Sequence, residues 1–512
     1  MTGGREFRRR RAKRLRSSRD ESRRPDALSV HRALRVSERG FMVFLSGHGV
    51  VFARPDRAGR RRSPAAGIQC AVASGGARYF SLLLEKVDDN MALSRGTRTL
   101  IGATLCASVT LMTAACGGSD GSGAPGASIF KSPHGSGSSS TTGTSGTTTS
   151  GTGGTSTGST QTTMALQMAD FILAQQDSNG AIPDEAGSGT ANTDSDMEYA
   201  LIGLAAAYGA THDAKYLNGL EKGIAWLAAR EEMTDPAWRG SWRYVYSMTP
   251  PYDPIPTSPG AGIADVRGVD ATSALFVYLL YLDRQLTGSS ALVTQYGANA
   301  RAALDFVLAK NINPSGYSGS SWQLPVGSTT WQFWPYEYAA DQGDVYLGMN
   351  GGALLFPDNP NYAAKAAFLR NNVPSQFYMT GAQRYSVGRD TGAPLDSDLG
   401  IDTIFPQGYL PWVFGANSQS IGSIQWMINQ TAADGSIRSP STDPAYALSN
   451  VILLLGAPTQ GMQAPSTTLP WIVNNVLDPQ TYGIHDYPGS PDQETNVSGF
   501  AVAALLGTKA FP

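Results

Sequence analysis

The chain has 512 residues, with 39 Lys and Arg, 41 Asp and Glu, and 3 Cys. All three cysteines lie before residue 117, which excludes a disulfide framework or a cysteine metal site in the rest of the chain. Residues 1–90 hold 21 basic and 9 acidic side chains, whereas residues 164–512 hold 15 and 31, and so acidic a C-terminal part argues against nucleic acid as a partner.

The first segment, residues 1–90, is basic and includes the run FRRRRAKRLRSSRDESRRP at 7–25. A basic arm that binds nucleic acid is one interpretation of such a run. We favour another, in which residues 1–90 are disordered or lie upstream of the true start. The reason is that an export signal begins at Met91.

Residues 91–116 have the pattern of a lipoprotein-type signal peptide. Arg95 and Arg98 form a basic region, an apolar stretch runs from 101 to 115, and small residues lead to Cys116. The final TAAC resembles a bacterial lipobox, which implies that Cys116 is lipidated and anchors an exported cell-envelope protein in the membrane, on the periplasmic or cell-surface side. Ordinary cleavage after Ala115 would instead give a free secreted protein.

A linker rich in Gly, Ser and Thr follows at 117–163. Such a composition buries too little apolar surface to fold, so we expect a flexible, disordered tether. A tether is useful to an anchored domain, which favours the lipoprotein interpretation over free secretion.

Residues 164–512 carry apolar segments at helical spacing, and these segments come in six pairs. The second segment of each pair is apolar nearly all round and rich in Ala and Gly, as expected of a helix buried on every side. Connections within a pair are long, and those between pairs are short. The pairs are 164–176 with 196–210, 214–232 with 270–286, 291–311 with 344–356, 361–373 with 402–416, 417–430 with 443–457, and 467–477 with 494–507.

Six helical hairpins with buried second helices resemble an all-α (α/α)6 toroid, the fold of the six-hairpin glycosidase superfamily. Its members include glucoamylase-like and unsaturated-glucuronyl-hydrolase-like enzymes, with polysaccharide lyases as more distant relatives. An open helical solenoid is the alternative, but six is the number that closes a ring. Pro406 and Pro411 are expected to interrupt the second helix of the fourth pair.

Acidic residues stand at or before the start of the second helix in every pair. Each of them can be a helix cap, because carboxylates accept hydrogen bonds from the free N–H groups of the first turn and complement the helix dipole. In a closed toroid, however, they converge on one cavity, where facing carboxyls have their pKa values pushed apart. These acids are Asp194, Asp196, Asp270, Asp341, Asp344, Asp396, Asp398, Asp402, Asp443 and Glu494, with Glu337 upstream of the third helix.

The resemblance also suggests roles. The sequence DVYLGM at 344–349 resembles an inner-helix motif of unsaturated-uronyl hydrolases whose aspartate donates a proton, which implies that Asp344 is the acid. Asp196 or Asp270 is the expected partner, with Asp194 and Asp402 as further catalytic candidates. Such a carboxyl pair is what glycosidic-bond hydrolysis needs.

Aromatic and charged residues of the long connections are candidates for substrate binding. Aromatic rings stack on sugars, although they can equally pack the long loops over the end of the barrel. Arginines bind uronate carboxylates, although ion pairs at the protein surface are their commoner role. The candidates for substrate binding are Trp242, Tyr244, Trp331, Trp334, Tyr336, Glu337, Arg243 and His485, with Arg267 and Arg389 as further arginines.

We therefore expect an exported, monomeric glycoside hydrolase that acts on an oligo- or polysaccharide without a metal or cofactor. A polysaccharide lyase would use His485 and Tyr482 beside a uronate. A terpene-cyclase-like toroid is less consistent, because Met197 and Leu399 depart from the Asp-x-Asp-Asp motif. A non-catalytic glycan-binding surface lipoprotein is the remaining alternative.

Overall fold

The computed structural model describes three strands at 32–36, 41–46 and 49–53, and then residues 157–260, 262–390, 392–395, 400–438 and 444–511. The chain divides into two units, Met1–Asp120 and Gly121–Pro512. The predicted signal peptide with Cys116, and residues 117–156 of the predicted linker, lie outside the described residues. No helix of the described segments is long and apolar enough to cross a bilayer.

The described part of the first unit is a three-stranded antiparallel sheet of β1 (Arg32–Val36), β2 (Phe41–Ser46) and β3 (Gly49–Ala53). Sequence analysis predicted no strands here. The segments FMVFLS and GVVFA are nevertheless rich in aromatic and β-branched residues, which favour extended backbone.

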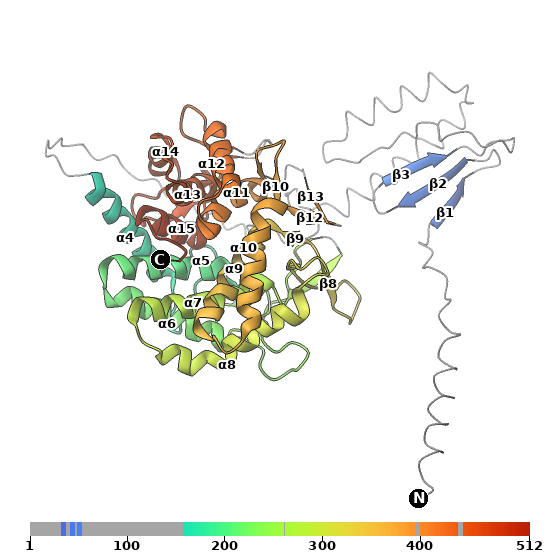
Figure 1. Ribbon diagram of the computed structural model, residues 1–512, viewed down its shortest axis with the longest axis horizontal. Helices are drawn as coiled ribbons and strands as arrows, with labels where there is room; N and C mark the ends of the chain where they lie inside the picture. The colour runs from blue at the N-terminus through green and yellow to red at the C-terminus, as the bar shows by residue number, and fades with distance from the viewer. Residues whose placement is uncertain are drawn as a thin grey trace, which may run out of the picture. The chain divides into compact units, whose positions relative to one another are not determined.

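The second unit is built of alternating outer and inner helices, as the six predicted pairs require (Figure 1). The outer helices are α4 (Thr157–Gln175), α6 (Ala214–Ala228), α8 (Ala291–Phe306), α10 (Pro360–Gln376), α12 (Ser418–Gln430) and α14 (Thr468–Asn475). The inner helices are α5 (Asp196–Thr211), α7 (Asp270–Thr287), α9 (Ala339–Leu355), α11 (Ile401–Phe414), α13 (Ala447–Gly456) and α15 (Thr495–Leu505). A π-turn η1 (Val307–Asn311) extends α8, and a 3-10 turn η2 (Pro458–Gln460) precedes α14.

The inner helices close into a ring. Each contacts the next inner helix along the chain, and the last, α15, returns to contact α5. This arrangement confirms the predicted (α/α)6 toroid and excludes an open solenoid.

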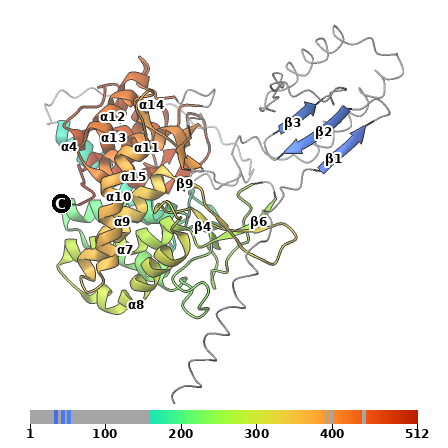
Figure 2. The same cartoon turned by 45° about the vertical axis from the view of Figure 1, so that its right-hand side comes forward.

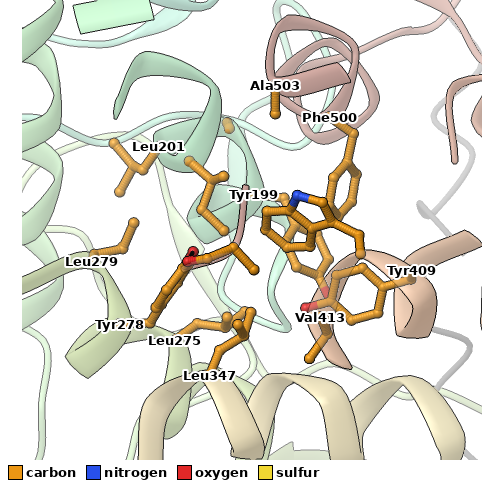
Figure 3. Packing of buried hydrophobic residues seen from close by; sticks show 14 of the residues in the cluster. Tyr199, Leu201, Leu275, Tyr278, Leu279, Leu347, Tyr409, Val413, Phe500 and Ala503 are labelled. Atoms are coloured by element: carbon orange, nitrogen blue, oxygen red, sulfur yellow. Dashed lines mark hydrogen bonds between the residues drawn. The ribbon is translucent and has the colours of Figure 1, made fainter. Parts of the chain in front are cut away.

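Burial differs between the two helix sets as the sequence pattern predicts. In α5 every residue from 196 to 207 is buried, whereas α6 exposes Lys215 and Lys222 along one face. Figure 3 shows the interior that results, where side chains of α5, α7, α9, α11 and α15 pack together. An inner helix has no solvent face, so only sequences that are apolar all round fit there.

Short strands lie in five of the six connections from an outer helix to the following inner helix, the described part of the α12–α13 connection having none, and they gather beside the ring (Figure 2). All the pairings are antiparallel. The sheets are β4 (Thr190–Asn192) with β5 (Val245–Ser247); β6 (Ile263–Arg267), β7 (Ser321–Pro325) and β8 (Gln332–Trp334); β9 (Glu337–Tyr338), β12 (Gly388–Asp390) and β13 (Ala393–Pro394); β10 (Tyr378–Met379) with β11 (Arg384–Tyr385); and β14 (Ile484–His485) with β15 (Gln493–Glu494).

Several helix boundaries differ from the expected ones, most clearly at two helix starts. Helix α4 begins at Thr157, seven residues before the predicted start of the domain at Met164, and α9 begins at Ala339 rather than Asp344. Polar residues extend a helix toward its N-terminus when the following turns are held by packing. A helix start inferred from the apolar pattern alone therefore falls too late in the chain.

The expectation that Pro406 and Pro411 interrupt the fourth inner helix was wrong, because α11 is continuous through both. Pro411 has no N–H to donate to the carbonyl of Gln407. Ser423 of α12 replaces that donor, since its Oγ hydrogen-bonds to the Gln407 carbonyl oxygen at 2.9 Å. The neighbouring helix therefore supplies the hydrogen bond that the proline removes.

Glycines let adjacent inner helices approach backbone to backbone. A Cβ on Gly348 of α9 would lie 2.3 Å from the Ala274 carbonyl oxygen of α7. We therefore expect Gly348→Ala to lower the free energy of unfolding by about 1–3 kcal/mol, through overpacking. Urea unfolding measures this change. The matched control is Gly297→Ala in α8, where the nearest atom lies at 3.6 Å. There we expect a gain of about 0.5–1 kcal/mol from helix propensity, and equal effects at the two sites would contradict the tight helix contact.

Candidate active site

Carboxylates from four inner helices lie together at the end of the ring where these helices begin. Asp194 precedes α5, Asp270 is the first residue of α7, and Asp341 and Asp402 lie in the first turns of α9 and α11. The first three are at most 4% exposed. Burial raises the pKa of Asp341 well above its usual range, and the charges of Asp270, Asp194, Asp344 and Asp402 raise it further. The predicted convergence of acids is therefore observed for these positions.

Asp270 and Asp341 form an interacting pair within this group. Burial raises the pKa of both carboxyls, and among the charges that raise the pKa of Asp341 further, that of Asp270 has the largest effect. Two buried carboxyls whose charges repel do not readily ionise together, so the raised pKa values favour a protonated group in the pair. A site of this kind presents an acid and a base together.

Asp194 adds a third carboxyl near the same place. Burial raises its pKa to about 7, and a hydrogen bond from the Tyr244 hydroxyl partly offsets this rise. Tyr244 was predicted to bind substrate, and the structure places its hydroxyl beside this acid.

Asp344, the predicted acid, lies about one turn deeper than Asp341 in α9 and is fully buried. Its carboxylate accepts hydrogen bonds from the hydroxyls of Tyr199, at 2.9 and 3.0 Å, and of Tyr409. Figure 3 shows both tyrosines in the packed interior. Burial raises the pKa of Asp344 to about 8, although the two hydroxyls lower it. Asp344 thus connects α5, α9 and α11 beneath the outer carboxyls.

Glu198 is an acid of this group that sequence analysis missed. It lies in α5, is fully buried, and neither carboxyl oxygen accepts a hydrogen bond from another described residue. Burial raises its pKa well above the usual range, as do the charges of Asp196, Asp194 and Asp344. The available signal was a single glutamate inside a helix that is otherwise apolar all round.

Asp196 has a different environment from the other acids. Its two oxygens accept hydrogen bonds of 2.6 Å from the side-chain amides of Asn192 and Asn496. Asn496 belongs to α15, so these hydrogen bonds join the first and last inner helices where the ring closes. The structure therefore favours a structural role for Asp196 over the predicted catalytic one.

We expect Asp196→Asn to lower the free energy of unfolding by about 1–3 kcal/mol, because an amide then faces two donor amides. Turnover per folded molecule should stay within about tenfold of wild type, since no reacting group is removed. Thermal melting and activity assays on the same preparation measure the two quantities. A large loss of turnover with unchanged stability would return Asp196 to the catalytic set.

Trp242, predicted to stack on sugar, is instead a core residue. It is 1% exposed, its Nε1–H donates to the Leu227 carbonyl at 2.8 Å, and its ring lies 5.3 Å from that of Phe276. The prediction was wrong because a tryptophan in a long connection caps the end of α6 rather than facing the substrate side.

Glu337 and Arg389 interact with each other rather than with the cluster of buried acids described above. Glu337 Oε2 lies 3.7 Å from Arg389 Nη1, and Glu337 Oε1 accepts hydrogen bonds from Asn313 and Ser315. In β9 the neighbouring Tyr338 has its pKa raised by burial and then by the Asp402 and Asp341 charges. Successive side chains of a strand point to opposite sides, so Tyr338 lies toward the acids and Glu337 lies away from them.

The other predicted binding residues differ in their surroundings. Tyr336 packs edge-on against Tyr338 with ring centroids 4.4 Å apart, and burial and then the Asp402 charge raise its pKa. Trp334 is half-buried in β8. His485 lies in β14 with its Nε2 3.7 Å from the Asp478 carboxylate. Trp331 lies 5.5 Å from the Arg243 guanidinium.

Three predicted acids, Asp396, Asp398 and Asp443, lie outside the described residues. Glu494 is described and buried, but its pKa is raised by burial and then by Asp486 and Glu185, so it belongs to a separate acidic group near α15. Among the described residues, no three His, Cys, Asp or Glu side chains are arranged to hold a metal ion.

No family model matches the sequence, and no curated protein matches it either. The structure is similar to that of a D-mannose isomerase, with a TM-score of 0.52 and 12% identity over 68% of this chain and 97% of that one. It is also similar to a cellobiose 2-epimerase from Spirochaeta thermophila DSM 6192, with a TM-score of 0.52 and 12% identity over 68% and 96% of the two chains. A glycosidase in complex with glucose matches with a TM-score of 0.47 and 13% identity over 69% and 98%. The isomerase and epimerase similarities establish the (α/α)6 toroid of six-hairpin proteins as the fold.

Proposed function

We propose that the protein is a carbohydrate-active enzyme, and more specifically a glycoside hydrolase that uses the carboxyls at the start of the inner helices. The observation that carries this proposal is the group of buried acids from separate inner helices, with Asp270 and Asp341 as its interacting pair. The isomerase and epimerase whose structures are similar act on sugars, which supports a carbohydrate substrate.

The chemistry follows from a shared proton. In the pair, the protonated carboxyl donates its proton to the glycosidic oxygen as the bond to the leaving group breaks. The ionised carboxyl then activates water or attacks the anomeric carbon. Asp194, with a pKa of about 7, is a neighbouring acid that can restore the proton. Tyr244 and Tyr338 present hydroxyls beside these acids for contacts with the sugar.

A panel of neutral and uronate-containing glycans tests this proposal. We expect the purified protein to release new reducing ends without an unsaturated product. Ultraviolet absorbance from an unsaturated uronate would identify a lyase instead. Binding of a glycan without any turnover would identify a glycan-binding protein.

A second candidate is a sugar isomerase or epimerase. Burial raises the pKa of Asp194 to about 7 and that of Asp344 to about 8, values that suit a group which takes and returns a proton near neutral pH. Deuterium incorporated from D2O at a carbon of a recovered free sugar would favour this activity. Hydrolysis leaves the carbon-bound hydrogens of the product unlabelled.

We also propose that the enzyme is exported and anchored through Cys116. The support is the sequence pattern of 91–116 alone. Mass spectrometry of the N-terminal peptide from the bacterial envelope tests it. We expect a lipid-modified peptide that begins at Cys116, and peptides from residues 1–90 in the mature protein would contradict the expectation.

A further inference from the structure

A second candidate binding region is a cavity of about 370 Å³ between the end of α6 and the connection that follows it. Three of the residues that line it are the arginines Arg230, Arg243 and Arg267. Glu232 is the acidic residue of the lining. We call this cavity the arginine pocket. It does not include the carboxyls described above, because Arg243 contacts Asp265 while the next residue, Tyr244, contacts Asp194.

The positive charge of the arginine pocket is only partly balanced. Arg243 pairs with Asp265, whereas no described carboxylate lies within ion-pair distance of Arg230 or Arg267. Glu232 accepts hydrogen bonds from the backbone of Thr234 and Asp235, and its charge offsets part of the positive charge, since it raises the pKa of Arg267. The nearby guanidinium groups therefore face the cavity with excess positive charge.

Aromatic rings hold two of these guanidinium groups in place. The Arg267 guanidinium lies 4.0 Å from the ring centroid of Trp238, and that of Arg230 lies 4.5 Å from the ring of Tyr252. The Nε atoms of all three arginines are buried and have no hydrogen-bond partner among the described residues. Burial and the neighbouring charge of Arg243 lower the pKa of Arg267 to about 10, so it stays protonated at neutral pH. Repulsion between these fixed charges falls when an anion binds.

We propose that the arginine pocket binds an oxyanion, either a carboxylate or a sulfate. The planar guanidinium fork matches both groups, and stacking on aromatic rings fixes its orientation before the ligand arrives. Tyr246, Tyr252 and the neighbouring prolines line the rest of the cavity with apolar surface. That surface accommodates the ring of an acidic sugar as readily as a free ion. The inference goes beyond the proposed hydrolase activity, because it concerns binding without turnover.

Tryptophan fluorescence and calorimetry test the inference with the full-length protein at low ionic strength. Trp238 and Trp331 both contact the Arg267 guanidinium, so an anion there should change tryptophan emission. The probes are sodium sulfate, glucuronate and, as the neutral comparison, glucose. We expect the anions to bind and glucose not to.

Two variants make the test specific to the pocket. Arg267→Gln should weaken anion binding by about tenfold or more, since it removes a charge-assisted donor pair. Arg267→Lys keeps the charge without the fork and should weaken binding less, which guards against a misfolded glutamine variant. The matched control is Arg301→Gln on α8, an exposed arginine paired with Asp358 at 2.7 Å, which should leave binding unchanged.

The relative affinities identify the source of the anion. Tighter binding of glucuronate than of sulfate indicates an acidic sugar, and sulfate binding alone indicates a free oxyanion. The inference is overturned when neither anion binds the wild-type protein, or when folded Arg267→Gln binds as wild type does. An inactive protein that still binds anions would refute the proposed hydrolase and leave this pocket standing.

Discussion

Asp341→Asn is expected to lower turnover by about 10²–10⁴-fold, the usual contribution of a positioned acid or base. Asp341 is buried in the first turn of α9, and the Asp270 charge has the largest effect among those that raise its pKa. Asparagine keeps the size of the side chain but can neither give nor accept the proton. The variant should fold at least as stably as wild type, because it removes one of several mutually repelling acids. Steady-state kinetics on the hydrolysed glycan and thermal melting measure the two effects.

Asp283→Asn is the matched control for this experiment. Asp283 is also buried, but it lies near the far end of α7 from Asp270, and burial raises its pKa to about 6. It should retain nearly wild-type turnover. Asp270→Asn should behave like Asp341→Asn, and the double variant should lose little more than either single variant, because the two carboxyls act as a unit. Full turnover by Asp341→Asn would exclude the pair as the acid and base.

The ring of helices was predictable because its cause lies in local sequence. A helix that is apolar all round must be buried on every side, and six such helices alternating with amphipathic ones leave few arrangements. Long connections before each inner helix likewise predicted where the acids would meet. The positions of Asp194, Asp270 and Asp341 follow from that periodicity alone.

What sequence analysis missed depends on contacts between distant segments. The continuity of α11 through Pro411 requires Ser423 on another helix. The burial of Trp242 depends on a carbonyl at the end of α6. Asp196 acts with Asn496, 300 residues away, which no local pattern relates to it. Helix patterns therefore predict which elements form, whereas the partners of individual polar groups are decided by how the elements meet.

The domain is expected to be most stable in mildly acidic solution and to lose stability as the pH rises from about 4 to about 8. Burial raises the pKa of Asp194 and Asp486 to about 7 and that of Asp344 and Glu231 to about 8. In the unfolded chain these carboxyls titrate near their ordinary values of about 4.

The sign follows from proton binding. Between about pH 4 and pH 8 the folded protein holds more protons than the unfolded chain, so raising the pH favours unfolding. Each group contributes until the pH passes its folded-state pKa, so the free energy of unfolding should fall throughout this interval. Urea unfolding at pH 4.5, 6 and 8 measures the trend. Asp344→Asn, which cannot titrate, should make the curve less steep between about pH 4 and 8. Stability that rises over this interval would show that these buried carboxyls are ionised in the folded protein, and the proton-sharing site would then lack its acid.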